Sequence, residues 1–359
     1  MLGIDFIGVN FDVAKESLRR WAAFAGRETG VRLVFGISNF CERDRVLPGS
    51  PSMTPEDAVR GIRAEIPAIR EIAHWTSDID ARLIHRLRQA GVASTPFYSA
   101  FNYGSVVNRL LLMAYSHGCD YLLRVDPGTS PPHRISFKAV IEEHTALIAN
   151  DPGTVVSRRY ADRFALRDEF VSDEPYREAH RRLVAEATGI DVAEQITGGA
   201  LLSFRLPGVP AIGFPDSADG LTLVWASDDG IYQTLAKSKH GVTAIPLKED
   251  PVARFDPVGK PKPWDEYYRG IVGAVLMACH LDGKGEKDAV AAARSFLDAL
   301  KTMTTIPEDI DLDRIAPRQY RKAIGAGIEN YLLLCDEWMT IVAILKDELK
   351  SLTKAEASQ

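Results

Sequence analysis

The chain has 359 residues, of which 46% are hydrophobic and 26% charged, and its formal net charge is −6. This length suits one large α/β domain with an extension, or two modest domains. The acidic balance argues against a dedicated nucleic-acid binder, which usually carries a basic face. The sequence contains no run of about 18 uninterrupted apolar residues, so no membrane span is predicted. The first residues lack the basic segment that is typical of signal peptides. The four cysteines are scattered and form no CxxC pair, which indicates reduced thiols. We therefore expect a cytoplasmic protein.

The first 125 residues alternate between strand-like and helix-like segments. Residues 4–9 form a short apolar run typical of a buried parallel strand, residues 12–25 have helical spacing, and residues 31–37 predict a second strand. Parallel strands need a helical crossover, so this opening predicts a βαβ unit. Further elements are predicted as helices at residues 55–73, 78–90 and 103–117, and as strands at residues 95–99 and 120–125.

The remainder of the chain changes from strands to helices. Strands are predicted at residues 153–158, 199–206 and 242–247, and helices at residues 176–187, 228–238, 264–280, 286–303 and 317–351. Four prolines in residues 250–263 predict a connection. We therefore expect an α/β sandwich with a mostly parallel central sheet in residues 1–250 and a helical C-terminal region in residues 251–359. The apolar faces of the last helices must pack on the rest of the chain, on each other or on a second subunit, which would make a homo-oligomer.

An acidic residue ends the strand predicted at residues 120–125. Asp126 follows it directly and precedes Pro127 and Gly128. In open α/β sheets, ligands bind outside the carboxyl ends of the strands, so this carboxylate suits a position facing a metal ion or a phosphate. Asp-Pro-Gly is also a common turn sequence, and the local pattern supports a purely structural turn equally well.

Two further patterns suit a ligand-binding cleft. Asp228 and Asp229 stand at the start of a predicted helix, where one carboxylate can cap the helix and the other can act as a general base. Gly198 and Gly199 begin a predicted strand, where paired glycines permit either a close backbone approach to a ligand or a tight turn.

Taken in order, these segments resemble the glycosyltransferases of the GT-A fold, especially their inverting family 2-like group. The resemblance covers about residues 4–248 and rests on three blocks. Residues 102–126, which end in GCDYLLRVD, are similar to the donor-binding stretch ahead of the family's DxD motif. Residues 198–216 resemble its Gly-Gly strand and Gly-Phe-Asp-Glu turn, and residues 225–241 resemble its Glu-Asp helix and the glycine that ends it.

The resemblance implies transfer of a sugar from a nucleoside-diphosphate sugar to the hydroxyl of a small-molecule or glycan acceptor, with inversion. The motif Gln-x-x-Arg-Trp of processive synthases is absent, so single transfers are expected. The resemblance also implies that Asp229 is the base, with Asp228 as the second candidate, and that Asp126 holds Mn²⁺ or Mg²⁺. The positions that it implies for donor binding are Asn10, Ser38, Asn39, Asn102, Asn108, Asp126, Gly198 and Gly199.

The chain departs from the family pattern at the metal-binding motif. Position 128 is Gly where the family has its second Asp. Either one carboxylate holds the cation, or Arg and Lys neutralise the phosphates instead. The missing carboxylate favours one alternative, a catalytically inactive nucleotide-sugar-binding or scaffolding protein of the same fold. A sugar-phosphate nucleotidyltransferase is a second alternative, which residues 8–13 disfavour because they lack a GxGxRL-type loop.

Overall fold

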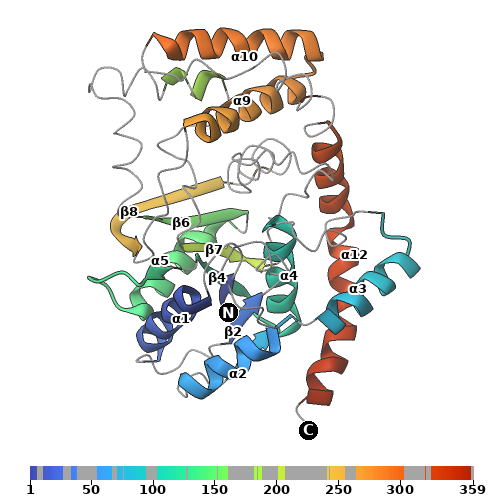
Figure 1. Cartoon of the computed structure of the whole chain (residues 1–359). Helices are drawn as coiled ribbons and strands as arrows, with labels where there is room; N and C mark the ends of the chain where they lie inside the picture. Colours follow the sequence, from blue (N-terminus) through green and yellow to red (C-terminus); the bar gives the residue numbers. More distant parts are fainter. Residues whose placement is uncertain are drawn as a thin grey trace.

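The computed structural model describes residues 1–5, 11–26, 34–38, 55–66, 71–75, 77–93, 103–126, 128–151, 153–160, 182–183, 185–187, 201–206, 241, 243–254, 264–302, 320 and 325–356. Within these residues, one sheet is covered by helices on both faces, and a group of C-terminal helices lies against one side (Figure 1).

The sheet has eight strands in the described part of the chain, in the order β3-β2-β1-β4-β7-β6-β8-β5. Their bounds are β1 Leu2–Asp5, β2 Phe35–Ser38, β3 Ile72–His74, β4 Tyr121–Val125, β5 Thr129–Ser130, β6 Thr154–Tyr160, β7 Leu201–Arg205 and β8 Thr243–Arg254. Pairing is parallel from β3 through β4 and between β6 and β8, and it is antiparallel where β7 joins β4 to β6 and where β5 joins β8. The expected α/β architecture with a mostly parallel sheet is confirmed.

Two apolar clusters cover the two faces of the sheet. Neighbouring residues of β4 alternate between them, with Leu122 in one and Leu123 in the other, as the two-residue repeat of a strand requires. Helices α1, α2 and α5 contribute to the cluster around Leu123, and the other helices to the cluster around Leu122. The helices are α1 Phe11–Ala25, α2 Pro55–Glu65, α3 Ser77–Gln89, α4 Tyr103–Ser116, α5 Phe137–Asn150, α9 Trp264–Leu281, α10 Glu286–Lys301 and α12 Gly325–Glu356.

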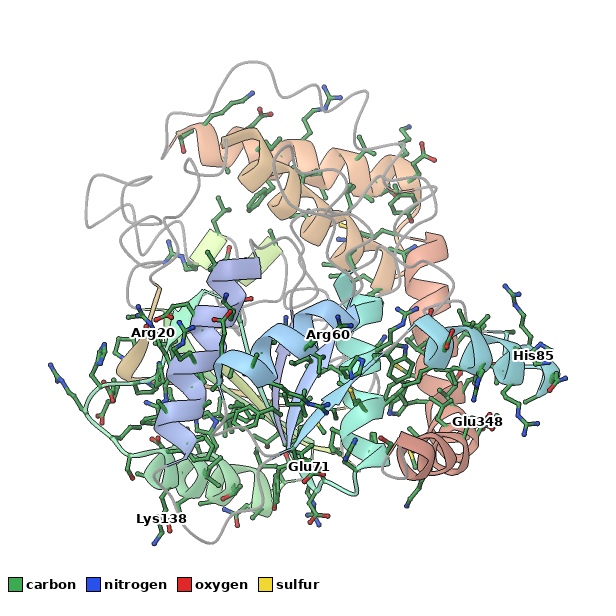
Figure 2. All side chains as sticks on the ribbon, turned by 60° about the horizontal axis from the view of Figure 1, so that its bottom comes forward. Arg20, Arg60, Glu71, His85, Lys138 and Glu348 are labelled. Carbon is green, nitrogen blue, oxygen red and sulfur yellow. The ribbon has the colours of Figure 1, made fainter. Side chains whose placement is uncertain are left out.

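The outer faces of these helices are charged, which completes their amphipathic pattern. The exposed side chains of Arg60 on α2, His85 on α3 and Lys138 on α5 point away from the core (Figure 2). Helix α4 lies close to the sheet because the strands beneath it carry glycine: a Cβ atom at Gly3 would stand 2.7 Å from Cδ2 of Leu110. This close packing fixes α4 over β1 and β2.

The C-terminal helices bury their apolar faces on the preceding part of the chain. Trp338 of α12, Leu276 of α9 and Phe296 of α10 belong to the same buried cluster as Leu110 of α4. Of the three packing partners that the sequence left open, the structure therefore shows contact with the N-terminal region. Within the described residues, no helix is both long and apolar enough to cross a membrane.

Several elements differ from the sequence-based prediction. The helix predicted to reach residue 73 ends at Glu65, because Pro67 follows and cannot continue it, and the edge strand β3 lies beyond. The strand β5 and the helix α5 were not predicted. The predicted strand at residues 95–99 and the predicted helix at residues 228–238 lie outside the described residues.

The connection predicted to begin at residue 250 begins later, because β8 continues to Arg254 through a bulge. The register with β6 shifts between Arg158 and Tyr160, and Asp250 has a positive φ of 48°. The guanidinium of Arg158 donates to the backbone carbonyls of Glu249 at 2.6 Å and Asp250 at 3.3 Å. These bonds hold the extra residues of a β-bulge, which is where a strand tolerates proline. The division at residue 250 into two domains stays a prediction.

We expect His144 of α5 to weaken the fold in acid. Burial lowers the pKa of His144 from 6.5 to about 3, and the nearby positive charge of Arg158 contributes. The unfolded chain binds a proton below pH 6.5 that the folded chain does not bind until about pH 3, so stability should fall as the pH falls through this range, by up to about 1.4 kcal/mol per pH unit. Urea unfolding at several pH values should show a shallower dependence for His144→Leu. An unchanged pH dependence in that variant would refute this assignment.

Candidate functional site

The order of the strands creates a topological switch point between β1 and β4. Strand β2 follows β1 in the chain and pairs with one side of it, and β4, which comes later in the chain, pairs with the other side of β1. Ligands of open α/β sheets bind outside the carboxyl ends of the strands at such a point. Ile4 is aligned with Val125, and Asp5 with Ser38, so the predicted site residues Ser38 and Asp126 follow the same edge. Between them β1 ends at Asp5, an acidic position that the sequence analysis missed.

Asp126 begins a turn at this edge. Gly128 has φ of +79°, the value of the third residue in a type II turn, and the Thr129 hydroxyl donates to the Asp126 carbonyl at 2.6 Å. Asp126 is half-buried and takes part in a further interaction within the chain. The φ of Gly128 fits the turn expected as one interpretation. It is compatible with the other interpretation, because the bond from Thr129 engages the backbone carbonyl of Asp126 and not its carboxylate.

Helix α1 and strand β8 hold this turn from two sides. The Trp21 indole Nε1 donates to Oγ1 of Thr129 at 3.2 Å, and the Ser17 hydroxyl donates to the Thr129 carbonyl at 2.9 Å. One residue further on, the guanidinium of Arg20 donates to Oγ of Ser130 at 2.6 Å; Figure 2 labels Arg20 on α1. The backbone of Thr129 pairs with Arg254 of β8. The turn after β4 is thus fixed by residues distant in the sequence.

A second buried network stands beyond the carboxyl end of β3. Nε of Arg109 lies 2.6 Å from Oδ1 of Asp80, and the second nitrogen of the guanidinium lies 3.1 Å from Oδ2. The indole of Trp75 donates to Oδ1 of Asp80 at 3.0 Å. Arg109 is fully buried, and the pair joins α3 to α4 beside the end of β3. The neighbouring Asn108, a predicted donor-binding residue, is also fully buried and interacts within the chain.

The other predicted site residues are placed only in part. Of Ser38 the structure gives the backbone, at the end of β2. The donor-binding roles of Ser38, Asn108 and Asp126 stay predictions. The remaining predicted residues lie outside the described part of the chain, and their roles also stay predictions: Asn10, Asn39, Asn102, Gly198, Gly199, Asp228 and Asp229.

The described residues contain few side chains that could together bind a metal ion. Among them, no group of three or more His, Cys, Asp and Glu side chains could hold an ion. Mg²⁺ is commonly held by one or two carboxylates together with substrate phosphates and water, and not by a complete protein cage. A single half-buried carboxylate at Asp126 fits this mode of binding.

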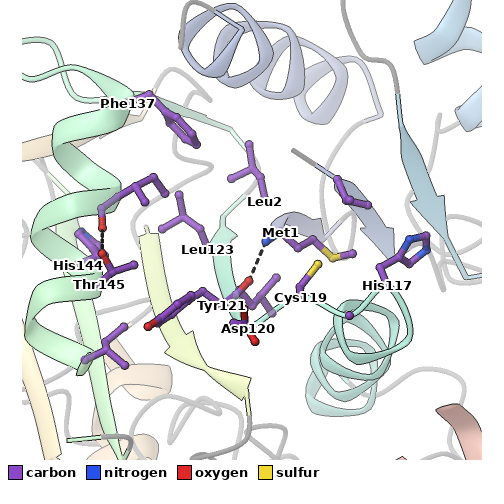
Figure 3. Close-up of a pocket in the computed structure, with 15 residues that line it drawn as sticks. Met1, Leu2, His117, Cys119, Asp120, Tyr121, Leu123, Phe137, His144 and Thr145 are labelled. Atoms are coloured by element: carbon purple, nitrogen blue, oxygen red, sulfur yellow. Dashed lines mark hydrogen bonds between the residues drawn. The ribbon is translucent and has the colours of Figure 1, made fainter. Parts of the chain in front are cut away.

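A cavity of about 310 Å³ lies at the opposite edge of the sheet (Figure 3). It is bounded by the amino-terminal ends of β1 and β4 and by α5, and most of its walls are apolar, including Leu2, Leu123 and Phe137. The amine of Met1 donates to the Tyr121 carbonyl at 2.7 Å, and burial lowers the pKa of this amine. Since parallel strands have one carboxyl edge, this cavity is separate from the turn at Asp126.

Comparisons with known proteins give structural matches to glycosyltransferases over most of the chain. A mannosyltransferase from Pyrobaculum calidifontis in complex with GDP-Man and Mn²⁺ matches with 15% identity and a TM-score of 0.44, over 100% of this chain and 87% of that chain. Glucosyl-3-phosphoglycerate synthase from Mycobacterium tuberculosis, in complex with Mg²⁺ and uridine-diphosphate, matches with 13% identity and a TM-score of 0.39, over 78% of this chain and 79% of that chain. Mouse xyloside xylosyltransferase 1 matches with 12% identity and a TM-score of 0.30, over 68% and 76% of the two chains.

No protein-family model and no curated protein matches the sequence. All three TM-scores lie below 0.5.

Proposed function

We propose that this protein is a glycosyltransferase of the GT-A type that moves a sugar from a nucleoside-diphosphate sugar to a hydroxyl of a small-molecule or glycan acceptor. The observation that carries the proposal is the position of Asp126, which follows β4 at the switch point between β1 and β4. This is where an open α/β sheet binds its ligand, and a carboxylate there suits the cation that accompanies a diphosphate. The three sequence blocks that resemble the family support the same assignment.

The role proposed for Asp126 is to hold a divalent cation against the donor diphosphate. Glycosyl transfer builds positive charge on the sugar ring and negative charge on the departing diphosphate. Mn²⁺ or Mg²⁺, when bound, neutralises that negative charge as a Lewis acid. The contribution of the chain is to orient one carboxylate through the turn that Gly128 permits.

The role proposed for Asp229 is to accept the proton of the acceptor hydroxyl as it attacks the sugar. Direct displacement by this hydroxyl gives inversion, and without a synthase motif the transfer ends after one sugar. We propose further that at least one C-terminal helix completes the acceptor side of the cleft. The packing of α12 on α3 and α4 supports this, because it brings the C-terminal region to the helices beside the switch point.

The proposal is tested by a screen of nucleoside-diphosphate sugars, first by thermal shift with Mn²⁺ and then by product analysis. A ligand that binds only the folded state raises the apparent stability, so the true donor should raise the melting temperature. Slow hydrolysis of that donor, or its transfer to an acceptor, is the expected activity. Binding without hydrolysis or transfer would support the inactive nucleotide-sugar-binding protein instead, and Gly128 in place of a second carboxylate is the observation that favours that alternative.

A further inference from the structure

A continuous chain of hydrogen bonds joins α1 to the turn that carries Asp126. The indole of Trp21 donates to the Thr129 hydroxyl, and the same hydroxyl donates to the Asp126 carbonyl. A hydroxyl has one hydrogen and two lone pairs, so Thr129 makes both bonds at once and each bond has a fixed direction. Trp21 and Thr129 are fully buried, which keeps these groups away from solvent.

The same residue is fixed through its backbone. The carbonyl of Thr129 accepts from the Ser17 hydroxyl, and the strand that it begins pairs with the end of β8. Only the short turn through Gly128 separates Thr129 from Asp126. The direction in which the chain leaves β4 is therefore determined by where Thr129 is anchored, and the Asp126 carboxylate moves with that anchor.

We propose that Thr129 is a positioning residue, which holds the Asp126 carboxylate in the orientation that binds the donor diphosphate and its cation. The inference rests on the proposed function of Asp126, and it adds a residue that acts through Asp126. Groups that orient a ligating side chain have large effects, and their replacement typically lowers metal affinity or activity about 10–100-fold. Thr129, Trp21 and Ser17 bear no sequence motif, and only the fold brings them to the site.

The test compares three variants by calorimetric titration with UDP and with GDP, each in the presence of Mn²⁺. Thr129→Val keeps the shape and removes the hydroxyl, and Thr129→Ser keeps the hydroxyl. Thr154→Val is the matched control, because it removes the hydroxyl of another buried threonine, which bonds Asp151 at the start of β6, at the opposite end of the sheet from the turn. We expect Thr129→Val to raise the Kd of the nucleotide that binds by about tenfold or more, and Thr129→Ser and Thr154→Val to leave it near the wild-type value.

Melting temperatures of the same variants separate positioning from general stability. Thr129→Val and Thr154→Val should both melt at lower temperature than the wild type, while only Thr129→Val loses affinity. Equal affinity in the wild type and Thr129→Val, or an equal loss in Thr154→Val, would overturn the positioning role and leave the proposed function standing. If the wild type binds no nucleoside diphosphate, the proposed function fails, and the inference fails with it. If Thr129→Val does not fold, Thr129→Cys takes its place, since a thiol is a weak donor.

Discussion

Asp229→Asn should lower the turnover of glycosyl transfer by about 10²–10⁴-fold, while the affinity for the donor changes little. The amide keeps the shape of the side chain but cannot accept the proton of the attacking hydroxyl. Asp229 is the second acidic residue of the pair at the start of a predicted helix, and it aligns with the base in the family that the sequence resembles. Steady-state kinetics with the donor from the screen and a verified acceptor measures this effect, and calorimetry measures donor affinity.

The neighbouring carboxylate supplies the control for this experiment. Asp228 is suited to cap the helix, so Asp228→Asn should affect stability more than catalysis, and the loss of a cap costs about 1 kcal/mol. The two variants should therefore separate, one in turnover and the other in melting temperature. Near-normal turnover of Asp229→Asn would place the base elsewhere and remove the main support for direct displacement.

Asp80→Asn should destabilise the protein by about 3–5 kcal/mol. The substitution leaves the Arg109 guanidinium, which is fully buried, without the carboxylate that now receives its Nε and a second nitrogen. A buried charge that loses its partner is much more costly than a pair that is removed together. Denaturant unfolding of the wild type and the variant measures the difference in the free energy of unfolding.

A double variant separates the two contributions. Asp80→Leu combined with Arg109→Leu removes both charges, so it should be less destabilised than Asp80→Asn alone. Because the pair joins α3 to α4 beside the carboxyl edge of the sheet, the single variant should also weaken donor binding if α4 contributes to the donor site. A single variant as stable as the wild type would show that the pair does not hold these helices together.

Local patterns predicted the elements whose signal lies within one segment. Residues 12–25 and 103–117 have helical periodicity, and α1 and α4 are found there; Gly118, which ends the second helix, has a positive φ of 66°. Helix α5 was missed although Ser136 caps it, because the polar His144 interrupts its apolar stripe of Phe137, Val140 and Ile148. Strand β5 has two residues and pairs with the distant β8, so no local pattern predicts it.

The candidate site divides in the same way. Asp126 was predictable, since an acidic residue directly after an apolar strand is a local signal, and the strand order then placed it at the switch point. The residues that hold its turn were not predictable, because Ser17 and Trp21 lie more than a hundred positions away from Thr129. The extension of β8 through a bulge was also not predictable, because Pro251 is typical of the end of a strand. The bonds from Arg158 that hold the bulge come from a distant strand.

The most direct test of the account is calorimetric titration of the wild type and of Asp126→Ala with the nucleoside-diphosphate sugar found in the screen, with Mn²⁺ present. The bond from the Thr129 hydroxyl goes to the backbone carbonyl of Asp126, which the substitution keeps, so the variant should fold. We predict that the wild type binds the donor and that Asp126→Ala binds both the donor and the free nucleoside diphosphate about tenfold or more weakly. Unchanged donor affinity in a folded Asp126→Ala variant would contradict the placement of the donor site at this turn.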